Sequence, residues 1–320
     1  MSLALVAGPG PTPTARPSVA HLRSAYMILA HKLPNQVLRL IDRLDGPGAH
    51  FFVHISKNAD PGFYESISRD VARRSNVSLV ERQWVHWGHF GLAKALFAAI
   101  EMAVQDGVRL DYLTVLSGQD YPVGGRRLIE ETLGKHRGNT LMEVRRIPSE
   151  IWGQGGLERF RIHHLRLAGR EVRFPPFSRR DDWLGQAART MGGIRSMPNG
   201  MEPYGGSSWV SLTYEAVEYL FEFSRSPFGR RTLRFFSTVL HPEEMVCQTI
   251  LMNSELSDRV YSRNFRYIDW TSHPKHPQVL TVQDYDRIVE SGAFLARKFD
   301  ETVCTAIMDA LDQVPLGVHD

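Results

Sequence analysis

The chain has 320 residues, of which 42% are hydrophobic and 23% charged, with a formal net charge of +3. These values are typical of a soluble globular protein that can bury a large core, and they exclude a long nucleic-acid-binding arm. Only two cysteines are present, Cys247 and Cys304, which excludes a disulfide framework and favours a reducing, cytoplasmic setting. No run approaches the ~18 consecutive apolar residues that a membrane span requires.

The first half of the chain alternates between predicted strands and predicted helices. Residues 1–23 are rich in Pro, Gly and Thr and are expected to form a flexible tail, whereas residues 24–320 are expected to form a single domain. Short apolar runs predict buried strands at 26–30, 51–55, 77–80 and 112–116. Amphipathic stretches predict helices at 34–44, 63–73 and 91–104. This alternation predicts an α/β fold with a mainly parallel sheet that helices cover on both faces.

Ligands of such sheets bind beyond the carboxyl ends of the strands. That rule marks His31, residues 54–57 and residues 117–120, which begin the turn-like stretch 117–122. A histidine directly after a strand is also commonly a packed or capping residue, so the position alone does not assign a function.

The second half is less regular. Residues 147–200 show no sustained period and are expected to form a long excursion over the sheet, where substrate contacts are common. Later elements are predicted as a strand over 206–212, a helix over 214–223, a last strand over 266–270 and a helix over 283–295. The adjacent His163 and His164 would not face one site together and are interpreted as surface residues.

A further helix is predicted to begin at Pro242, which suits the first helical position. Glu243 and Glu244 follow in its first turn. Acidic side chains there stabilise a helix N-terminus, but a carboxylate at a loop-to-helix junction can also remove a proton from a substrate hydroxyl. The local sequence alone favours the first interpretation.

Several chemistries lack their motif. The turn after the first strand, residues 30–34, contains no glycine, which excludes a dinucleotide-binding turn. Neither a Walker loop nor a Gly-x-Ser-x-Gly elbow occurs. The single Asp-x-Asp, at residues 284–286, stands at the front of a predicted helix and is interpreted as first-turn acids rather than as a metal site.

Sugar transfer from a nucleotide diphosphate has needs that the sequence can meet. An inverting transfer requires a base for the acceptor hydroxyl and positive charge for the leaving diphosphate. Lys275, Arg297 and Lys298 supply basic side chains in the late segment. For Arg297 and Lys298 the alternative is that they are ordinary cations at a helix C-terminus.

Seven short blocks follow one another in a characteristic order. They are Ala30-His31-Lys32, residues 52–55, residues 85–88, residues 116–122, residues 206–209, Pro242-Glu243-Glu244 with Gln248-Thr249, and residues 294–299. In these blocks, over about residues 26–300, the chain resembles the Core-2/I-branching glycosyltransferase family. That family includes β-1,6-N-acetylglucosaminyltransferases and protein xylosyltransferases.

The resemblance implies an A-type glycosyltransferase fold and an inverting reaction that needs no metal or other cofactor. It assigns Glu244 as the catalytic base and Lys298 as a contact of the donor diphosphate. Lys275 falls where the family has a second diphosphate contact, an arginine, and Glu143 falls on an acceptor-contacting glutamate. The expected donor is UDP-N-acetylglucosamine, with UDP-xylose as the alternative.

The predicted site divides into a donor part and an acceptor part. Besides the lysines, the donor part includes Arg297, His31, His54 and Ser56. The residues expected to line the acceptor cleft are Ser117, Gly118, Gln119, Asp120, Glu143, Gly206, Ser207, Ser208, Trp209, Tyr267 and Trp270. Trp209 and Trp270 could stack on a sugar or belong to the core.

Three departures from the family pattern bear on partners and location. Ser56 stands where the second-strand block normally ends in Asp, so nucleotide contacts there are expected to differ. Two basic acceptor contacts fall near Ile151 and Gln154, which indicates an acceptor other than the animal one. The vertebrate anchor and cysteines have no counterpart, in keeping with a cytoplasmic enzyme.

The expected partners are a UDP-sugar and a hydroxyl-bearing acceptor, not nucleic acid. Polysaccharide, lipid-linked glycan, protein and small-molecule acceptors all stay open, and a lipid-linked acceptor would bring peripheral membrane contact. A non-catalytic glycan- or nucleotide-binding relative is the rival interpretation.

Overall fold

The computed structural model describes residues 22–174, 195–271 and 276–314. Its centre is a seven-stranded sheet built from β1 (Ser24–Ala30), β2 (His50–Ile55), β3 (Val77–Val80), β4 (Tyr112–Ser117), β6 (Thr140–Leu141), β11 (Ser211–Thr213) and β12 (Val260–Tyr261). The strand order is β12-β6-β11-β4-β1-β2-β3, and only β11 runs antiparallel to its neighbours. The prediction of a mainly parallel α/β sheet is therefore confirmed.

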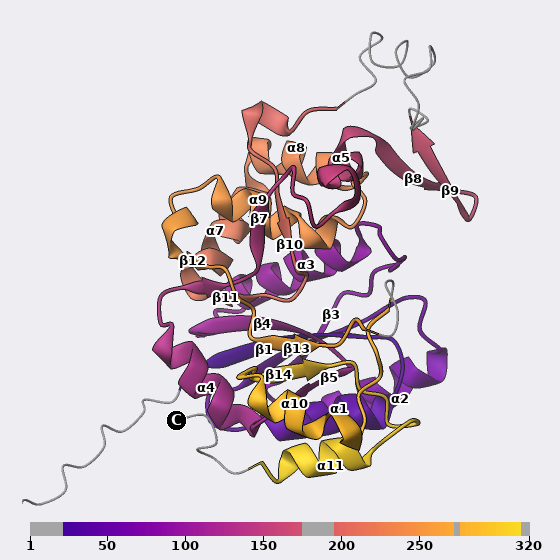
Figure 1. Cartoon of the computed structure of the whole chain (residues 1–320), viewed down its shortest axis with the longest axis vertical. Helices are drawn as coiled ribbons and strands as arrows, with labels where there is room; N and C mark the ends of the chain where they lie inside the picture. The colour runs from indigo at the N-terminus through magenta and orange to yellow at the C-terminus, as the bar shows by residue number, and fades with distance from the viewer. Residues whose placement is uncertain (1–21, 175–194, 272–275, 315–320) are drawn as a thin grey trace, which may run out of the picture.

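Helices cover both faces of this sheet (Figure 1). One layer contains α1 (Pro34–Leu44), α2 (Pro61–Val71), α4 (Gly125–Lys135), α10 (Tyr285–Glu290) and α11 (Ala306–Asp312). The other contains α3 (Gly91–Gln105), α7 (Tyr214–Arg225), α8 (Pro227–Phe236) and α9 (Val246–Met252). Side chains of β1 alternate between them: Tyr26 and Ile28 enter the first core, and Ala25 and Met27 the second. Burial on both faces explains why β1 is an uninterrupted apolar run.

A second, three-stranded sheet joins β5 (Asp120–Pro122), β14 (Leu295–Arg297) and β13 (Arg266–Ile268). Two predictions are wrong here. Residues 120–122 are a strand rather than part of a turn, and the helix predicted over 283–295 ends at Glu290. Gly292, at φ +67°, turns the chain out of the helix, and β14 then pairs with β5 and β13. The last strand is consequently β14.

The strand predicted over 206–212 is divided. Its first part belongs to β10 (Tyr204–Gly206), which pairs with β7 (Val144–Arg146), and its last part is β11. Between β10 and β11 the chain leaves the main sheet, and there the Gln248 amide donates to the Ser207 carbonyl (2.8 Å). A side chain on Gly206 would overlap the Glu143 carbonyl, so this pairing requires glycine.

The excursion after β7 contains α5 (Glu158–Arg161) and a hairpin of β8 (His163–Leu167) and β9 (Arg170–Phe174). The interpretation of both histidines as surface residues is wrong for His164. Its side chain is buried, and its Nε2 donates to the Glu158 carbonyl (3.0 Å).

The helix predicted from Pro242 begins as a 3-10 turn over Pro242–Glu244 and continues as α9. Near the start of the chain, Leu22 is buried and Arg23 pairs with Asp111 (3.0 Å). In the part of the chain that the structure describes, no helix is long and apolar enough to cross a membrane.

Candidate active site

Three basic side chains, His31, Lys32 and Lys298, gather beyond the carboxyl end of β1. Lys32 Nζ lies 2.8 Å from a carboxylate oxygen of Asp300, whereas Lys298 forms no ion pair with another described residue. Partial burial and the charges of Lys32 and Arg297 lower the pKa of Lys298. Desolvation and the charges of Lys32 and Lys298 lower the pKa of His31. The cluster therefore holds more positive charge than Asp300 balances, which suits a diphosphate.

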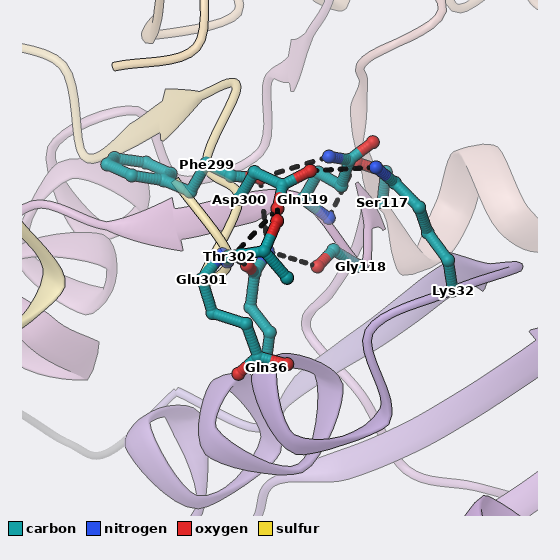
Figure 2. A network of polar contacts seen from close by, with 9 residues as sticks. All are labelled: Lys32, Gln36, Ser117, Gly118, Gln119, Phe299, Asp300, Glu301 and Thr302. Atoms are coloured by element: carbon teal, nitrogen blue, oxygen red, sulfur yellow. Dashed lines mark hydrogen bonds and ion pairs between the residues drawn. The ribbon is translucent and has the colours of Figure 1, made fainter. Parts of the chain in front are cut away.

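Buried amides fix the position of this cluster (Figure 2). The Gln36 side chain, at the start of α1, donates to the Gly118 carbonyl (2.7 Å) and accepts from the Glu301 N–H (2.8 Å). Gln119 and Phe299 exchange two further hydrogen bonds, of 3.0 and 2.9 Å. The turn after β4 and the chain around Lys298 are thus joined directly and through α1.

Beneath this turn lies a buried ion pair. Asp120 has no exposed surface, accepts from the backbone (2.5 Å) and hydroxyl (2.6 Å) of Ser117, and pairs with Arg266. Arg266 also donates to the Val115 carbonyl (2.9 Å). Since a buried carboxylate with these partners cannot reach a ligand, Asp120 supports the site from below.

Two guanidinium groups lie over the Trp209 ring. The guanidinium carbon of Arg297 is 4.0 Å from the ring centroid and that of Arg266 is 4.9 Å from it. Burial lowers the pKa of Arg297, and its Nε has no hydrogen-bond partner among the described residues. Because Arg297 belongs to strand β14, the alternative of a cation at a helix C-terminus is wrong for it.

The two acids of the 3-10 turn have different surroundings. Glu244 lies 2.6 Å from Arg159, whose guanidinium stacks on Trp152 at 4.9 Å, and its side chain is 30% exposed. Glu243 is 11% exposed and lies 3.3 Å from Nδ1 of His241. Glu244 is therefore the more accessible of the two acids, which the sequence pattern alone could not decide.

Glu143 connects Glu244 with the buried arginines. Burial raises the pKa of Glu143, against the lowering effect of Arg145 and Arg266, and the nearby charge of Glu244 raises it further. Glu143 thus lies within electrostatic range of both Glu244 and Arg266. From Arg266, ring contacts lead through Trp209 to Arg297, the residue next to Lys298.

A family model described as Core-2/I-Branching enzyme matches residues 24–289, most of the chain. The chain belongs to this family. Among its relatives, Xylosyltransferase 2 of Rattus norvegicus is 25% identical over 311 residues, covering 91% of this chain and 33% of the relative. Beta-glucuronosyltransferase GlcAT14B of Arabidopsis thaliana is 27% identical over 309 residues, covering 89% of this chain and 65% of the relative. The chain spans about a third of the length of the xylosyltransferases that it matches.

Membership of the Core-2/I-branching family confirms the resemblance drawn from the short blocks. The mainly parallel sheet and its flanking helices agree with the A-type glycosyltransferase fold that the resemblance implied.

Some residues predicted for the donor part have structural roles in this Core-2/I-branching chain. His54 is 1% exposed and accepts from the Gln83 N–H (3.0 Å), and burial lowers its pKa to about 4. Ser56 is 5% exposed and its hydroxyl accepts from the Asn58 N–H (3.1 Å). Lys275 lies outside the described residues.

The predicted acceptor residues separate into supports and exposed groups. Gly206 lets β10 approach Glu143, and the Ser207 hydroxyl accepts from the Trp209 N–H (3.3 Å). Ser208 and Tyr267 are partly buried, and Trp270 is 51% exposed. Asp284 closes a capping box with Thr281, as its interpretation as a helix-start acid predicted. Among the described residues, no three His, Cys, Asp or Glu side chains gather as metal ligands.

Sequence reasoning missed Arg159, Arg266 and Trp87. Arg159 and Glu244 are 85 positions apart, and Arg266 and Asp120 are 146 apart, so no local pattern could have paired them. Trp87 belongs to one of the family blocks but received no role. Its ring packs edge-on against His241, with centroids 4.4 Å apart, and is 70% exposed beside the 3-10 turn that carries Glu243 and Glu244.

Proposed function

We propose that the chain is an inverting, metal-independent glycosyltransferase that transfers a sugar from a UDP-sugar to an acceptor hydroxyl in β linkage. The observation that carries this proposal is that a partly exposed carboxylate, Glu244, and the basic cluster at Lys298 both flank the group formed by Glu143, Arg266, Trp209 and Arg297, in which the two guanidiniums lie on the Trp209 ring and Glu143 is within electrostatic range of Glu244 and Arg266. A base and a diphosphate-binding cluster at the two ends of one site meet the two requirements of this reaction.

In the proposed step, Glu244 removes the proton of the acceptor hydroxyl while the oxygen attacks C1 of the donor sugar. The new C1–O bond forms on the face opposite UDP, the bond from C1 to the diphosphate breaks, and the configuration at C1 inverts. Lys298 and Lys32 offset the negative charge of the departing UDP, His31 is proposed to donate a hydrogen bond to it, and Lys275 is proposed to join them.

Arg159 is proposed to orient the base. Its guanidinium is 13% exposed and held by Trp152, so the contact with Glu244 fixes the carboxylate with little freedom. A guanidinium has five N–H donors, and the contact with Glu244 occupies one. The others have no partner among the described residues and are proposed to serve an acceptor oxygen, in place of the basic contacts that the family pattern puts near Ile151 and Gln154.

The proposed donor sugar is supported by the relatives rather than by the geometry. The names of the relatives favour UDP-xylose, with UDP-glucuronate and UDP-N-acetylglucosamine as further candidates. The rival proposal, a non-catalytic glycan- or nucleotide-binding protein, keeps ligand binding but lacks turnover.

A donor panel tests the proposal. UDP and UDP-sugars are expected to raise the melting temperature of the chain, and one UDP-sugar should then release UDP slowly to water and faster when a broad acceptor mixture is added. EDTA should leave this release unchanged. Ligand binding with no release of UDP would support the rival, and activity that EDTA abolishes and manganese restores would overturn the metal-free mechanism.

A further inference from the structure

The hairpin β8–β9 is a two-stranded ribbon that extends from the body beside α5 (Figure 1). Among the described residues, these strands pair only with each other. Side chains alternate between its two faces. The register places Leu165, Leu167, Val172 and Phe174 on one face, with His163 and Arg170, and places His164, Arg166, Glu171 and Arg173 on the other.

The apolar face of this ribbon is open to solvent. Leu167 is 57% exposed, Phe174 59% and Val172 38%. His164, on the opposite face, is buried against the Glu158 carbonyl, and its backbone N–H donates to the Thr238 carbonyl (2.8 Å). The ribbon therefore packs on the body at its root through His163 and His164, whereas the apolar side chains of Leu167, Val172 and Phe174 stay exposed. Adjacent exposed apolar side chains of this size indicate an interaction surface.

The same segment carries a strong positive charge. Residues 161–174 contain four arginines and one glutamate, a net charge of 4 − 1 = +3 in 14 residues. All four arginines are exposed. Near an anionic lipid surface each such residue strengthens binding by about fivefold. Arginine can also keep its charged end at the headgroups while its aliphatic part lies beside apolar neighbours. Apolar side chains framed by arginines thus match an anionic bilayer surface.

We propose that β8–β9 docks the protein on an anionic phospholipid surface and turns the active site toward acceptors held there. The link to the site is short. His163 Nδ1 lies 3.1 Å from the Thr238 hydroxyl, the Leu240 N–H donates to the Arg159 carbonyl (2.8 Å), and Arg159 holds Glu244. Only the orientation toward an acceptor rests on the proposed function, because the docking itself requires no catalysis.

Sedimentation with vesicles tests the docking. The full chain is expected to bind vesicles of phosphatidylcholine with phosphatidylglycerol and to lose this binding at high salt. It should not bind vesicles of phosphatidylcholine alone. Leu167→Ser/Phe174→Ser should weaken binding about tenfold or more, because it removes the apolar contact. Arg166→Glu/Arg170→Glu should weaken it by more than about twentyfold, because it reverses two charges.

Matched controls carry the same changes elsewhere. Arg69→Glu/Arg231→Glu, on α2 and α8, and Val282→Ser/Val303→Ser, at positions 51% and 60% exposed, should bind vesicles nearly as the unaltered chain does. The shift in melting temperature with UDP reports separately on fold and donor site. A missing UDP shift in the unaltered chain would count against the proposed function and not against the docking.

Two results would overturn the docking proposal. The unaltered chain would not bind anionic vesicles, or the ribbon variants would bind these vesicles as tightly as the unaltered chain. Ribbon-dependent self-association without lipid binding would show a protein partner instead. Hydrogen exchange of the unaltered chain decides the matter even where a variant fails to fold. Amides of residues 163–174 should exchange more slowly on anionic vesicles, and unchanged exchange there contradicts the proposal.

Discussion

The proposed donor side and the proposed acceptor side of the site are built differently. On the donor side, Lys32 and Lys298 follow strands β1 and β14, and buried amides from Gln36 and Gln119 hold them in place. On the acceptor side, Glu244 lies on a single 3-10 turn, and its partner Arg159 comes from a short helix in an irregular segment. The donor side thus depends on the sheet, whereas the acceptor side depends on contacts between loops.

The two sides also differ in charge. The basic cluster has an excess of positive charge, with Lys298 unpaired among the described residues, and is ready for an anionic ligand. Glu244 already has a cationic partner, so its position is set before any acceptor arrives. The difference suggests that donor affinity comes from charge and that acceptor choice comes from geometry.

The largest effect is expected at the base. Glu244→Gln should lower transfer by about a thousandfold, since a general base contributes roughly 10² to 10⁴ in rate, and should leave UDP affinity nearly unchanged. Glu243→Gln is the matched control, because Glu243 faces His241. Rates of transfer and calorimetric titration with UDP check both variants. Near-normal turnover of Glu244→Gln would remove Glu244 from the mechanism.

Arg159→Ala should lower transfer by about ten- to a hundredfold, because misplacing a reacting group costs rates of this order. Arg159→Lys keeps the charge and should recover part of the loss, although lysine lacks the planar fork. The exposed neighbour Arg161→Ala serves as control. UDP affinity should stay constant in all three variants, and equal losses in the alanine and lysine variants would show that charge does not orient the base.

The pH dependence of stability tests whether His54, on strand β2, is a buried structural residue rather than a donor contact. Burial lowers its pKa to about 4, against about 6.5 in an unfolded chain, so the unfolded chain binds more protons between these values. The free energy of unfolding should therefore fall as the pH falls through this window. Between pH 7.5 and 5 the original chain should lose about 2 kcal/mol more than His54→Gln in urea unfolding. Equal losses would mean that His54 titrates in the folded chain as it does in the unfolded chain.

Lys298→Ala should weaken UDP binding by about tenfold, as expected for one charge-assisted contact. Lys32→Ala should have a smaller effect because Asp300 already engages Lys32. Lys94→Ala, exposed on α3, is the control. Calorimetry at low and high salt measures the three affinities, and a Lys298→Ala variant that binds UDP normally would separate this lysine from the diphosphate.

The contrast between the two sides also explains what the sequence could predict. Strands and helices of the first half follow from apolar periodicity. Glu244 and Lys298 are assigned from the family blocks that contain them. Strand β14 was predicted as the end of a helix because its apolar pattern continues that of α10, and the turn at Gly292 and pairing with β5 override it. The contacts of Arg159 and Arg266 depend on tertiary folding of loops, for which one sequence holds no local signal.

A crystal structure with UDP bound tests the central claim most directly, namely that the basic cluster and Glu244 are the two ends of one site. We predict that the diphosphate contacts Lys298 and Lys32 and that its terminal phosphate faces the space between Trp209 and Glu244. A diphosphate bound elsewhere, with Glu244 on a separate surface, would contradict the account.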